Sequence, residues 1–210
     1  ESGYLTFDKG TKKYFPSILF TGFASWLSGI YPNGEVLRQL ARETHQKLGA
    51  TISITVQHEQ YMRALIIEMD GDVSPPSYDF RVRIPLVGSA GGLLVLATLP
   101  DKEVTELLNK EFARLPPNER QEKCNQTWQE VRQTRERRYS KKYHNLTIDD
   151  HIAHLVVVCV PIPMPDNMPP MVLAISTTDL NCKGQEDELA KSMRIIINKY
   201  RDLLGAPVDK

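Results

Sequence analysis

The segment Ile84–Thr98 constrains the fold of this chain more than any other part of the sequence. It opens with small residues, Ile84-Pro-Leu-Val-Gly-Ser-Ala-Gly-Gly92, and continues as the apolar run Leu93-Leu-Val-Leu-Ala-Thr98. This pattern predicts a buried helix whose first N–H groups lack partners within the helix and are open to a small anion. A purely structural turn before a core helix has the same pattern, and neither G-x-G-x-x-G nor a P-loop motif is present.

Composition excludes several classes of protein. The chain has 210 residues, 41% of them hydrophobic, which is enough for a core in one or two domains. Its 26 basic residues balance 26 acidic ones, so binding to nucleic acid or membrane would require a local patch or a further domain. The three cysteines, Cys124, Cys159 and Cys182, are too few and too widely spaced for a disulfide framework or a C-x-x-C zinc site. With no secretory signal and no apolar run of about 18 residues, we expect a cytoplasmic protein.

The N-terminal part of the chain predicts a hairpin and two helices. Residues 2–15 read as two strands around a turn at Asp8-Lys-Gly10, and an isolated hairpin of this kind is marginal in water. We therefore expect it to pack against a part of the protein that precedes Glu1. Apolar residues at helical spacing predict one helix after Pro16 and a second over 35–48, which Gly49 would cap.

The remainder predicts a sheet interrupted by helices. Thr51-Ile-Ser-Ile-Thr-Val alternates with period two, and 61–69 is apolar enough to be its antiparallel partner. Further strands are predicted at 78–86, 151–163 and 171–178, and further helices at 101–112, 116–139 and 185–204. This order predicts an α+β fold with a GAF/PAS-like antiparallel sheet flanked by helices, and it excludes a Rossmann domain.

The predicted helix over 116–139 carries a basic run at its C-terminal end. It comprises Arg132, Arg135, Arg137, Arg138, Lys141 and Lys142. Runs of this kind are usually a solvated helix face, and contact with phosphate is the alternative.

The sequence contains five short motifs, in this order: Gly3-Tyr-Leu with Lys13-Tyr-Phe, Ile84 to Gly92, Asp149-Asp150, Cys159-Val-Pro-Ile-Pro163 and Leu173-Ala-Ile-Ser-Thr-Thr178. Together they resemble the motifs of the isocitrate lyase regulator (IclR) family of bacterial transcription factors. The resemblance covers nearly the whole chain. In that family a winged helix-turn-helix binds DNA, a linker helix follows, and a GAF-like domain binds a small organic effector and builds the oligomer.

The resemblance implies a domain organisation and a function. Residues 1–15 would be the wing hairpin of a winged helix-turn-helix that is otherwise missing, 16–34 the linker helix, and 35–205 the effector-binding domain. The chain would bind a small organic acid, act on operator DNA through the missing domain, and form a homodimer or homotetramer. It would have no cofactor, no metal, no catalytic activity and no contact with a membrane. Coupling between effector and DNA would be a shift between two conformational populations.

The resemblance also implies the residues of an effector site. The small segment would offer backbone amides to an effector carboxylate, an acidic residue and a cysteine ten positions apart would face the effector, and two hydroxyls would share one face of a strand. The predicted effector-binding residues are Gly88, Ser89, Ala90, Gly91, Asp149, Cys159, Ser176 and Thr178.

Each of these residues also has a structural interpretation, and the sequence departs from the family at three places. Cys159 would serve as a core residue, Asp149 as a turn cap, and the two hydroxyls as ordinary strand residues. After the acidic pair the family usually has more acid and then a glycine, whereas this chain reads Asp149-Asp-His-Ile-Ala-His-Leu-Val156. Val87 stands where the family commonly has histidine, and Leu93 where it often has lysine. One end of the pocket is therefore more apolar, which predicts an effector with a hydrophobic body. The apolar residues Val87 and Leu93 also favour the alternative of a GAF-like interaction module whose pocket is filled by its own side chains.

Some of the same residues are compatible with two other kinds of site, a catalytic site and a metal site. Cys159, His151, His154 and Asp149 could imitate a nucleophile, a base and an orienting acid. However, His151 and Cys159 would lie about 26 Å apart within one straight strand, at roughly 3.3 Å per residue. A metal site would use these residues together with Asp150, but their spacing lacks a compact ligand pattern.

Overall fold

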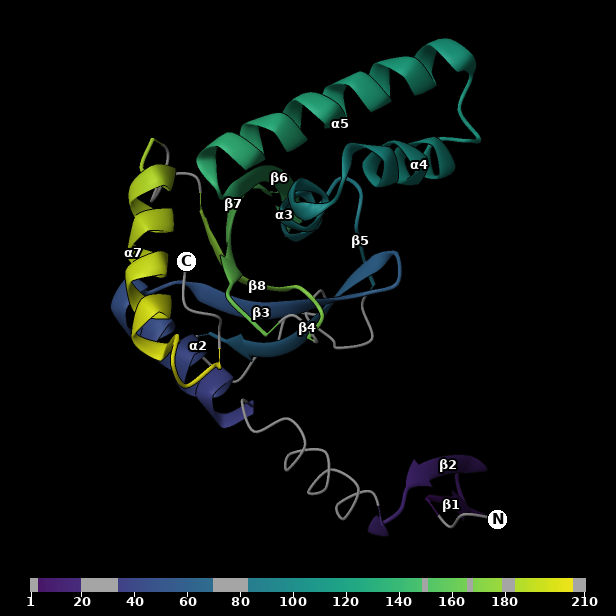
Figure 1. The fold of residues 1–210 in the computed structure, drawn as a ribbon. Coiled ribbons are helices and arrows are strands. Elements are labelled where there is room, and N and C mark those ends of the chain that lie inside the picture. Colours follow the sequence, from purple (N-terminus) through teal and green to yellow (C-terminus); the bar gives the residue numbers. More distant parts are fainter. Residues whose placement is uncertain are drawn as a thin grey trace.

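A six-stranded antiparallel sheet organises the computed structural model, with strand order β5-β4-β3-β8-β7-β6 (Figure 1). The structure describes residues 4–19, 34–69, 83–148, 151–165, 168–178 and 184–205, and of 145–148 and 151–154 the backbone only. The strands are β3 Thr51–His58, β4 Tyr61–Glu68, β5 Ile84–Pro85, β6 Ser140–Ile148, β7 His151–Ile162 and β8 Met171–Thr178. The helices are α2 Gly34–Leu48, α3 Ala90–Thr98, α4 Asp101–Glu111, α5 Pro117–Arg137 and α7 Glu186–Tyr200.

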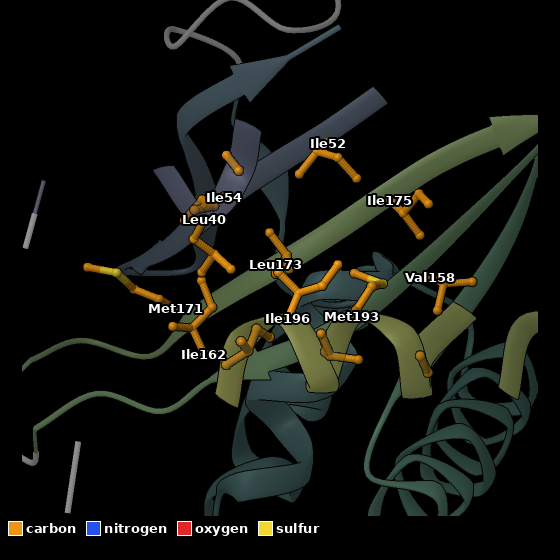
Figure 2. Packing of buried hydrophobic residues seen from close by; sticks show 14 of the residues in the cluster. Leu40, Ile52, Ile54, Val158, Ile162, Met171, Leu173, Ile175, Met193 and Ile196 are labelled. Atoms are coloured by element: carbon orange, nitrogen blue, oxygen red, sulfur yellow. The ribbon is translucent and has the colours of Figure 1, made fainter. Parts of the chain in front are cut away.

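Helices α2 and α7 cover one face of the sheet. Alternate residues of β3, β7 and β8 point to this face and form one aliphatic cluster with the helices. Figure 2 shows Leu40 of α2 and Met193 and Ile196 of α7 packed against strand residues such as Leu173, which is fully buried. The cluster is therefore the main hydrophobic core, and burial of its apolar surface is the main favourable contribution to folding on this side.

The other face of the sheet is covered by α3, with α4 and α5 beyond it (Figure 1). A second cluster forms here from the apolar residues of α3 together with Met62, Cys159, Val172 and Ala174 of the sheet. The strand residues on this face are smaller or more polar than their neighbours on the α2 and α7 face. The short helix α3 is apolar around its whole circumference, as expected for a helix enclosed between a sheet and a second layer.

Two glycines fix the start of α3. Gly88 has a φ of +93°, a backbone conformation that favours glycine. At Gly92, a Cβ atom would lie 1.7 Å from the carbonyl oxygen of Leu86, so only a glycine fits against this backbone. Ser89 caps the helix, because its side-chain oxygen accepts a hydrogen bond from the Gly92 N–H at 3.1 Å.

Arg135 of α5 fixes the other end of α3. Its guanidinium donates to the carbonyl oxygens of Ala97 at 3.1 Å and Leu99 at 2.8 Å, and to the Asp101 carboxylate at 2.7 Å. The last carbonyls of a helix lack partners within the helix, so these bonds satisfy groups that burial would otherwise penalise. Arg135 thereby joins α5 to the connection between α3 and α4.

Half of the basic run is thus bound to carboxylates within the domain, at Arg135, Lys141 and Lys142. Lys142 binds Glu130 at 2.5 Å, and Lys141 lies 3.6 Å from Glu186. The interpretation as a solvated helix face is wrong for Arg135 and Lys142, because side chains that are about a third exposed or less bind partners within the domain.

A separate two-stranded sheet forms at the N-terminus from β1 Leu5–Asp8 and β2 Lys13–Pro16. The Asp8 carboxylate accepts hydrogen bonds from the Thr11 hydroxyl at 2.7 Å and from the Gly10 N–H at 2.9 Å, and these bonds lower the pKa of Asp8. The rings of Phe7 and Tyr14 lie 5.0 Å apart across the strands and are largely exposed. The predicted hairpin is confirmed, with a slightly longer turn.

The α+β fold with an antiparallel sheet is confirmed, and one strand was missed. The helix over 35–48 is confirmed and ends at Gly49, whose φ is +61°. The strand β6 was not predicted, because Lys141-Lys-Tyr-His-Asn145 lacks the apolar alternation of a half-buried strand. The predicted linker helix falls mostly outside the described residues, as does most of the predicted strand at 78–86, of which Ile84–Pro85 is described as β5.

Candidate functional site

The first turn of α3 presents backbone N–H groups on the face of the sheet that α3 covers. Within the helix, the first carbonyl acceptor is that of Ser89, which bonds the Leu93 N–H at 3.0 Å. The N–H groups of Ala90 and Gly91 precede this bond and have no carbonyl partner within the helix. Because the helix dipole places partial positive charge here, this turn favours an anion.

Hydroxyl groups line the sheet beneath α3. Ser53 of β3, Ala174 of β8, Cys159 of β7 and Ser140 of β6 are aligned as direct cross-strand partners. Ser176 lies in the next row on the same face, two residues along β8 from Ala174. Ser140 links this row to α3, because its hydroxyl donates a hydrogen bond to the Ala90 carbonyl oxygen at 2.5 Å.

Thr55 is the unusual residue of this face. Its side chain is only 5% exposed, and its hydroxyl oxygen is buried without a hydrogen-bond partner. The oxygen lies 3.5 Å from the position that a Cβ on Gly91 would occupy, so it faces the first turn of α3. A buried polar group without a partner lowers the stability of the folded state by about 1–3 kcal/mol. Here the destabilising group lies at the first turn of α3.

Cys159 is a neutral thiol in this setting. Its side chain is 1% exposed, and burial raises the pKa of the thiol to about 12, against the smaller lowering effect of the Ser140 hydroxyl. A thiol with this pKa stays protonated near neutral pH, whereas nucleophilic and metal-binding cysteines act as thiolates. Cys159 can therefore contribute shape and weak polarity to the site.

The structure brings some of the predicted site residues together. Gly88, Ser89, Ala90 and Gly91 all lie at the start of α3, over the sheet. Ser89 already uses its side-chain oxygen to cap Gly92, so it holds the helix start in place. This arrangement favours recognition of an anion by backbone N–H groups over recognition by the Ser89 hydroxyl.

The predicted residues on the strands are more widely spread. Ser176 is buried near the Cys159 row, whereas Thr178 is exposed at the end of β8. Both lie on the face of β8 that α3 covers, as their spacing predicted. Asp149 lies outside the described residues.

Sequence reasoning did not single out Ser53, Thr55, Met62 and Ser140, all of which lie under α3. The signal for two of them was available in Thr51-Ile-Ser-Ile-Thr-Val, where hydroxyls alternate with isoleucines. Such alternation means that one face of the strand is apolar and the other carries hydroxyls. Met62 and Ser140 gave no signal, because their position depends on the pairing of distant strands.

The residues of the alternative catalytic and metal sites fall only partly within the described part of the chain. His151 and Cys159 lie on the same continuous strand β7 and are separated along its length. Among the described residues, no three His, Cys, Asp or Glu side chains gather closely enough to hold a metal ion. Asp149, Asp150 and the side chains of His151 and His154 lie outside this description. No helix in the described ranges is both long and apolar enough to cross a membrane.

Comparison by sequence finds no relative: no protein-family model and no characterised protein matches this chain at a significant level. Comparison of structures does find proteins of similar fold. An IclR transcriptional regulator from Silicibacter sp. TM1040 has a TM-score of 0.71 at 17% identity, over 99% of this chain and 80% of that one. The effector domain of the transcriptional regulator IclR from Acinetobacter sp. ADP1 has a TM-score of 0.62 at 16% identity, over 83% of this chain and 98% of that one.

A third solved structure contains a ligand. It is an IclR homologue from Microbacterium hydrocarbonoxydans complexed with 4-hydroxybenzoate, with a TM-score of 0.67 at 17% identity. The match covers 94% of this chain and 79% of that one. At these identities a likeness in structure establishes the fold. The described part of the chain therefore has the fold of IclR-family effector domains.

Proposed function

We propose that this chain is the effector-sensing part of an IclR-type transcription regulator and that it binds a small organic acid between α3 and the sheet. The single observation that carries the proposal is the buried, unpartnered hydroxyl of Thr55 at the first turn of α3. Helix N-termini favour anions, and an unsatisfied hydroxyl beside one is a second polar group that a ligand can satisfy.

The ligand's carboxylate would accept hydrogen bonds from the N–H groups of Ala90 and Gly91. A second polar group on the ligand would meet a hydroxyl of the sheet, either Thr55 or Ser176, which lie on opposite sides of the Ser53–Ala174 pair. Met62 and Leu93, both nearly fully buried, would contact an apolar body. This division of roles favours an organic acid with a hydrophobic body and a further hydroxyl or keto oxygen. That Asp149 faces the effector is part of the same proposal.

Binding would act on DNA through a population shift. A ligand that prefers one position of α3 would favour one arrangement of the linker at 16–34, and hence of a DNA-binding domain that includes the hairpin of 1–15. Allosteric coupling of this kind typically amounts to about 1–3 kcal/mol. Operator DNA, a homodimer or homotetramer built by 35–205, and a cytoplasmic location are parts of this proposal.

Catalysis is not part of it. The Cys159 thiol is protonated near neutral pH and is enclosed by the sheet and α3, so it lacks the activation that a nucleophile requires.

One observation favours a second candidate, an interaction module without a small-molecule effector. The Met62 side chain lies 3.7 Å from the position of a Gly91 Cβ and is 1% exposed, so it fills part of the space beneath α3. If the Met62 side chain always occupies this space, the region beneath α3 is part of the hydrophobic core. The domain would then act only through contacts made by its surface.

A thermal-shift experiment separates the two candidates. The probe is 4-hydroxybenzoate, because it carries a carboxylate, an apolar ring and a hydroxyl, together with a panel of aliphatic hydroxy and keto acids. A ligand at one hundred times its Kd stabilises the fold by about 2.7 kcal/mol, which raises Tm measurably. We expect an acid of this class to raise Tm for the wild type and to lose most of the effect in Thr55→Val and Ser176→Ala.

Two results would contradict the proposal. A broad panel without any shift would favour the interaction module. A shift that survives both hydroxyl substitutions would place the ligand elsewhere. Met62→Ala is the companion variant, because it enlarges the space beneath α3 and should strengthen binding of the bulkier acids only if that space is the site.

A further inference from the structure

A groove between α4 and α5 is a separate feature of the molecule. The two helices form a hairpin joined by residues 112–116, on the side of α3 that faces away from the sheet (Figure 1). Between them lies a cavity of about 570 Å³. Lining residues recur every three or four positions on each helix, such as Thr105, Leu108 and Asn109 on α4, so one face of each helix borders the cavity. Its volume is in the range of sites for small molecules.

The groove combines an apolar floor with polar walls. Leu108 is nearly fully buried at the floor, and Trp128 and Cys124 are half-buried beside it. Carboxamide side chains supply most of the polar wall on both helices, as at Asn109 on α4 and Asn125 on α5. An apolar surface with a few convergent polar groups is the usual composition of a binding site for a small organic molecule.

Arg120 supplies the charge. One of its terminal nitrogens donates to the carbonyl oxygens of Ala113 at 3.1 Å and Leu115 at 3.4 Å, which fixes the guanidinium against the turn between the helices. Its Nε atom is buried and has no hydrogen-bond partner, and no carboxylate of the described residues forms an ion pair with it. A fixed guanidinium with an unused N–H is suited to a planar carboxylate.

Nearby charges reinforce this preference. The guanidinium carbons of Arg132 and Arg135 lie 5.9 and 5.8 Å from the centre of the Trp128 ring. Arg135 is neutralised by Asp101, whereas Arg120 and Arg132 form no ion pair with any carboxylate that the structure describes. Arg120 is the one charged residue among those that line the groove, so its α5 side presents a positive charge beside an aromatic surface.

From these observations we infer that the groove between α4 and α5 is a second ligand site, selective for a small aromatic carboxylate. The carboxylate pairs with the Arg120 guanidinium, which lines the groove, and the ring packs against Leu108 and Trp128. The site is distinct from the one proposed beneath α3, because α3 lies between the sheet and α5 (Figure 1). Its existence does not depend on the proposed function.

Cys124 provides a local measurement of occupancy. Its thiol lines the groove and is partly exposed, whereas Cys159 is buried in the core. The rate of alkylation of Cys124 by iodoacetamide is measured by peptide mass spectrometry, with benzoate as the probe and benzyl alcohol as its uncharged counterpart. We expect benzoate to slow alkylation at least fivefold, with saturation at millimolar concentration, and benzyl alcohol to have little effect.

Substitutions test the assigned contacts. Arg120→Gln should weaken the protection by benzoate at least tenfold, whereas Arg132→Gln, on the same helix but outside the cavity lining, should change it less than threefold. Asn109→Met fills the groove without touching the bonds of Arg120, so it should abolish protection even if Arg120→Gln folds poorly. Circular dichroism and Tm establish that each variant is folded.

Three outcomes would overturn the inference. They are no protection of the wild type by benzoate, equal protection by benzyl alcohol, and protection that persists in the folded Arg120→Gln or Asn109→Met protein. Protection that is retained in Thr55→Val, together with loss in Asn109→Met, distinguishes this groove from the site beneath α3. The two proposals are therefore tested independently, the site beneath α3 by thermal shift and the groove by the alkylation rate of Cys124.

Discussion

The two faces of the sheet are formed by the same strands but differ sharply in chemistry. On the face covered by α2 and α7, Ile54, Leu173 and Val160 are direct cross-strand neighbours, and all are buried aliphatic residues. One residue along β3, on the face covered by α3, Ser53 begins a row with Ala174 and Cys159. Adjacent residues of each strand therefore alternate between large aliphatic side chains on one face and small or polar side chains on the other.

This difference separates stability from recognition. The aliphatic face gains free energy from removing apolar surface from water, and its strand side chains pack closely against α2 and α7. The face beneath α3 holds hydroxyls and small side chains, one of which, Thr55, is buried unpartnered. We therefore expect substitutions on the first face to change stability and those on the second to change ligand binding.

Leu173→Ala should have the largest effect of the substitutions considered. Leu173 is fully buried in the middle of the aliphatic cluster, so truncation leaves a cavity and should cost about 2–5 kcal/mol of unfolding free energy. Ser53→Ala on the opposite face should cost less than about 1 kcal/mol. Urea denaturation of both variants measures the contrast.

Equal losses in the two variants would contradict the division into a structural and a recognition face. The m-value serves as the control, because an unchanged m-value shows that each variant has changed stability alone.

The glycines of α3 provide a sharper comparison within a single helix turn. Gly92→Ala places a Cβ against the Leu86 carbonyl and should cost about 1–3 kcal/mol or more, because backbone must move. Gly91→Ala makes ordinary contacts of 3.5 Å with Thr55 and 3.7 Å with Met62, so stability should change by less than about 1 kcal/mol. Tm measures both effects.

The same pair tests the proposed effector site. Gly91→Ala should weaken binding of an acid ligand, because the methyl group occupies space beside the Thr55 hydroxyl. Unchanged affinity in calorimetry would show that the ligand does not approach this turn.

The fold could be predicted from the sequence where short-range patterns carry it. Alternation in 51–56, the glycine cap at Gly49 and the small residues before Leu93 each have a local physical cause, and each predicted element formed. The strand β6 could not be predicted in this way, because Lys141-Lys-Tyr-His-Asn145 is an edge strand fixed by its pairing with β7.

The site was less predictable for a related reason. The resemblance named the start of α3, Cys159 and Ser176, which the structure places on one face of the sheet. It gave no indication of Thr55, because a buried hydroxyl without a partner is a property of the packed structure. The capping role of Ser89 likewise depends on backbone geometry at α3.

Most core substitutions lower the free energy of unfolding, whereas Thr55→Val should raise it. Removing a buried hydroxyl that has no partner should stabilise the unliganded protein by about 1 kcal/mol, while the affinity for an acid effector falls several-fold. Thr51→Val is the matched control on the same strand and face, where the side chain is half-buried, and it should change stability by less than about 0.5 kcal/mol. A loss of stability in Thr55→Val would mean that the hydroxyl has a partner in the free protein.

The smallest expected effect concerns the polar network at the solvent edge of the aliphatic face. The Glu43 carboxylate accepts hydrogen bonds from Lys199 and Lys47, both at 2.6 Å, and from the Tyr200 hydroxyl at 2.7 Å, which joins α2 to α7. These bonds, that of Lys199 most of all, lower the pKa of Glu43 from its usual 4.5 to about 2. A carboxyl group whose pKa is depressed by folding stabilises the protein above its unfolded pKa, and this contribution is lost as the pH falls towards the folded pKa.

Glu43→Gln should therefore destabilise the protein at pH 7 and have progressively less effect between pH 4.5 and 2. The side chain is 24% exposed and screened by solvent, so we expect a cost of only about 0.5–1 kcal/mol. Glu35→Gln, an exposed carboxylate on the same helix, should change stability by less than about 0.3 kcal/mol. A difference between Glu43→Gln and the wild type that persists unchanged at pH 2 would show that the side chain joins α2 to α7 by packing rather than by its charge.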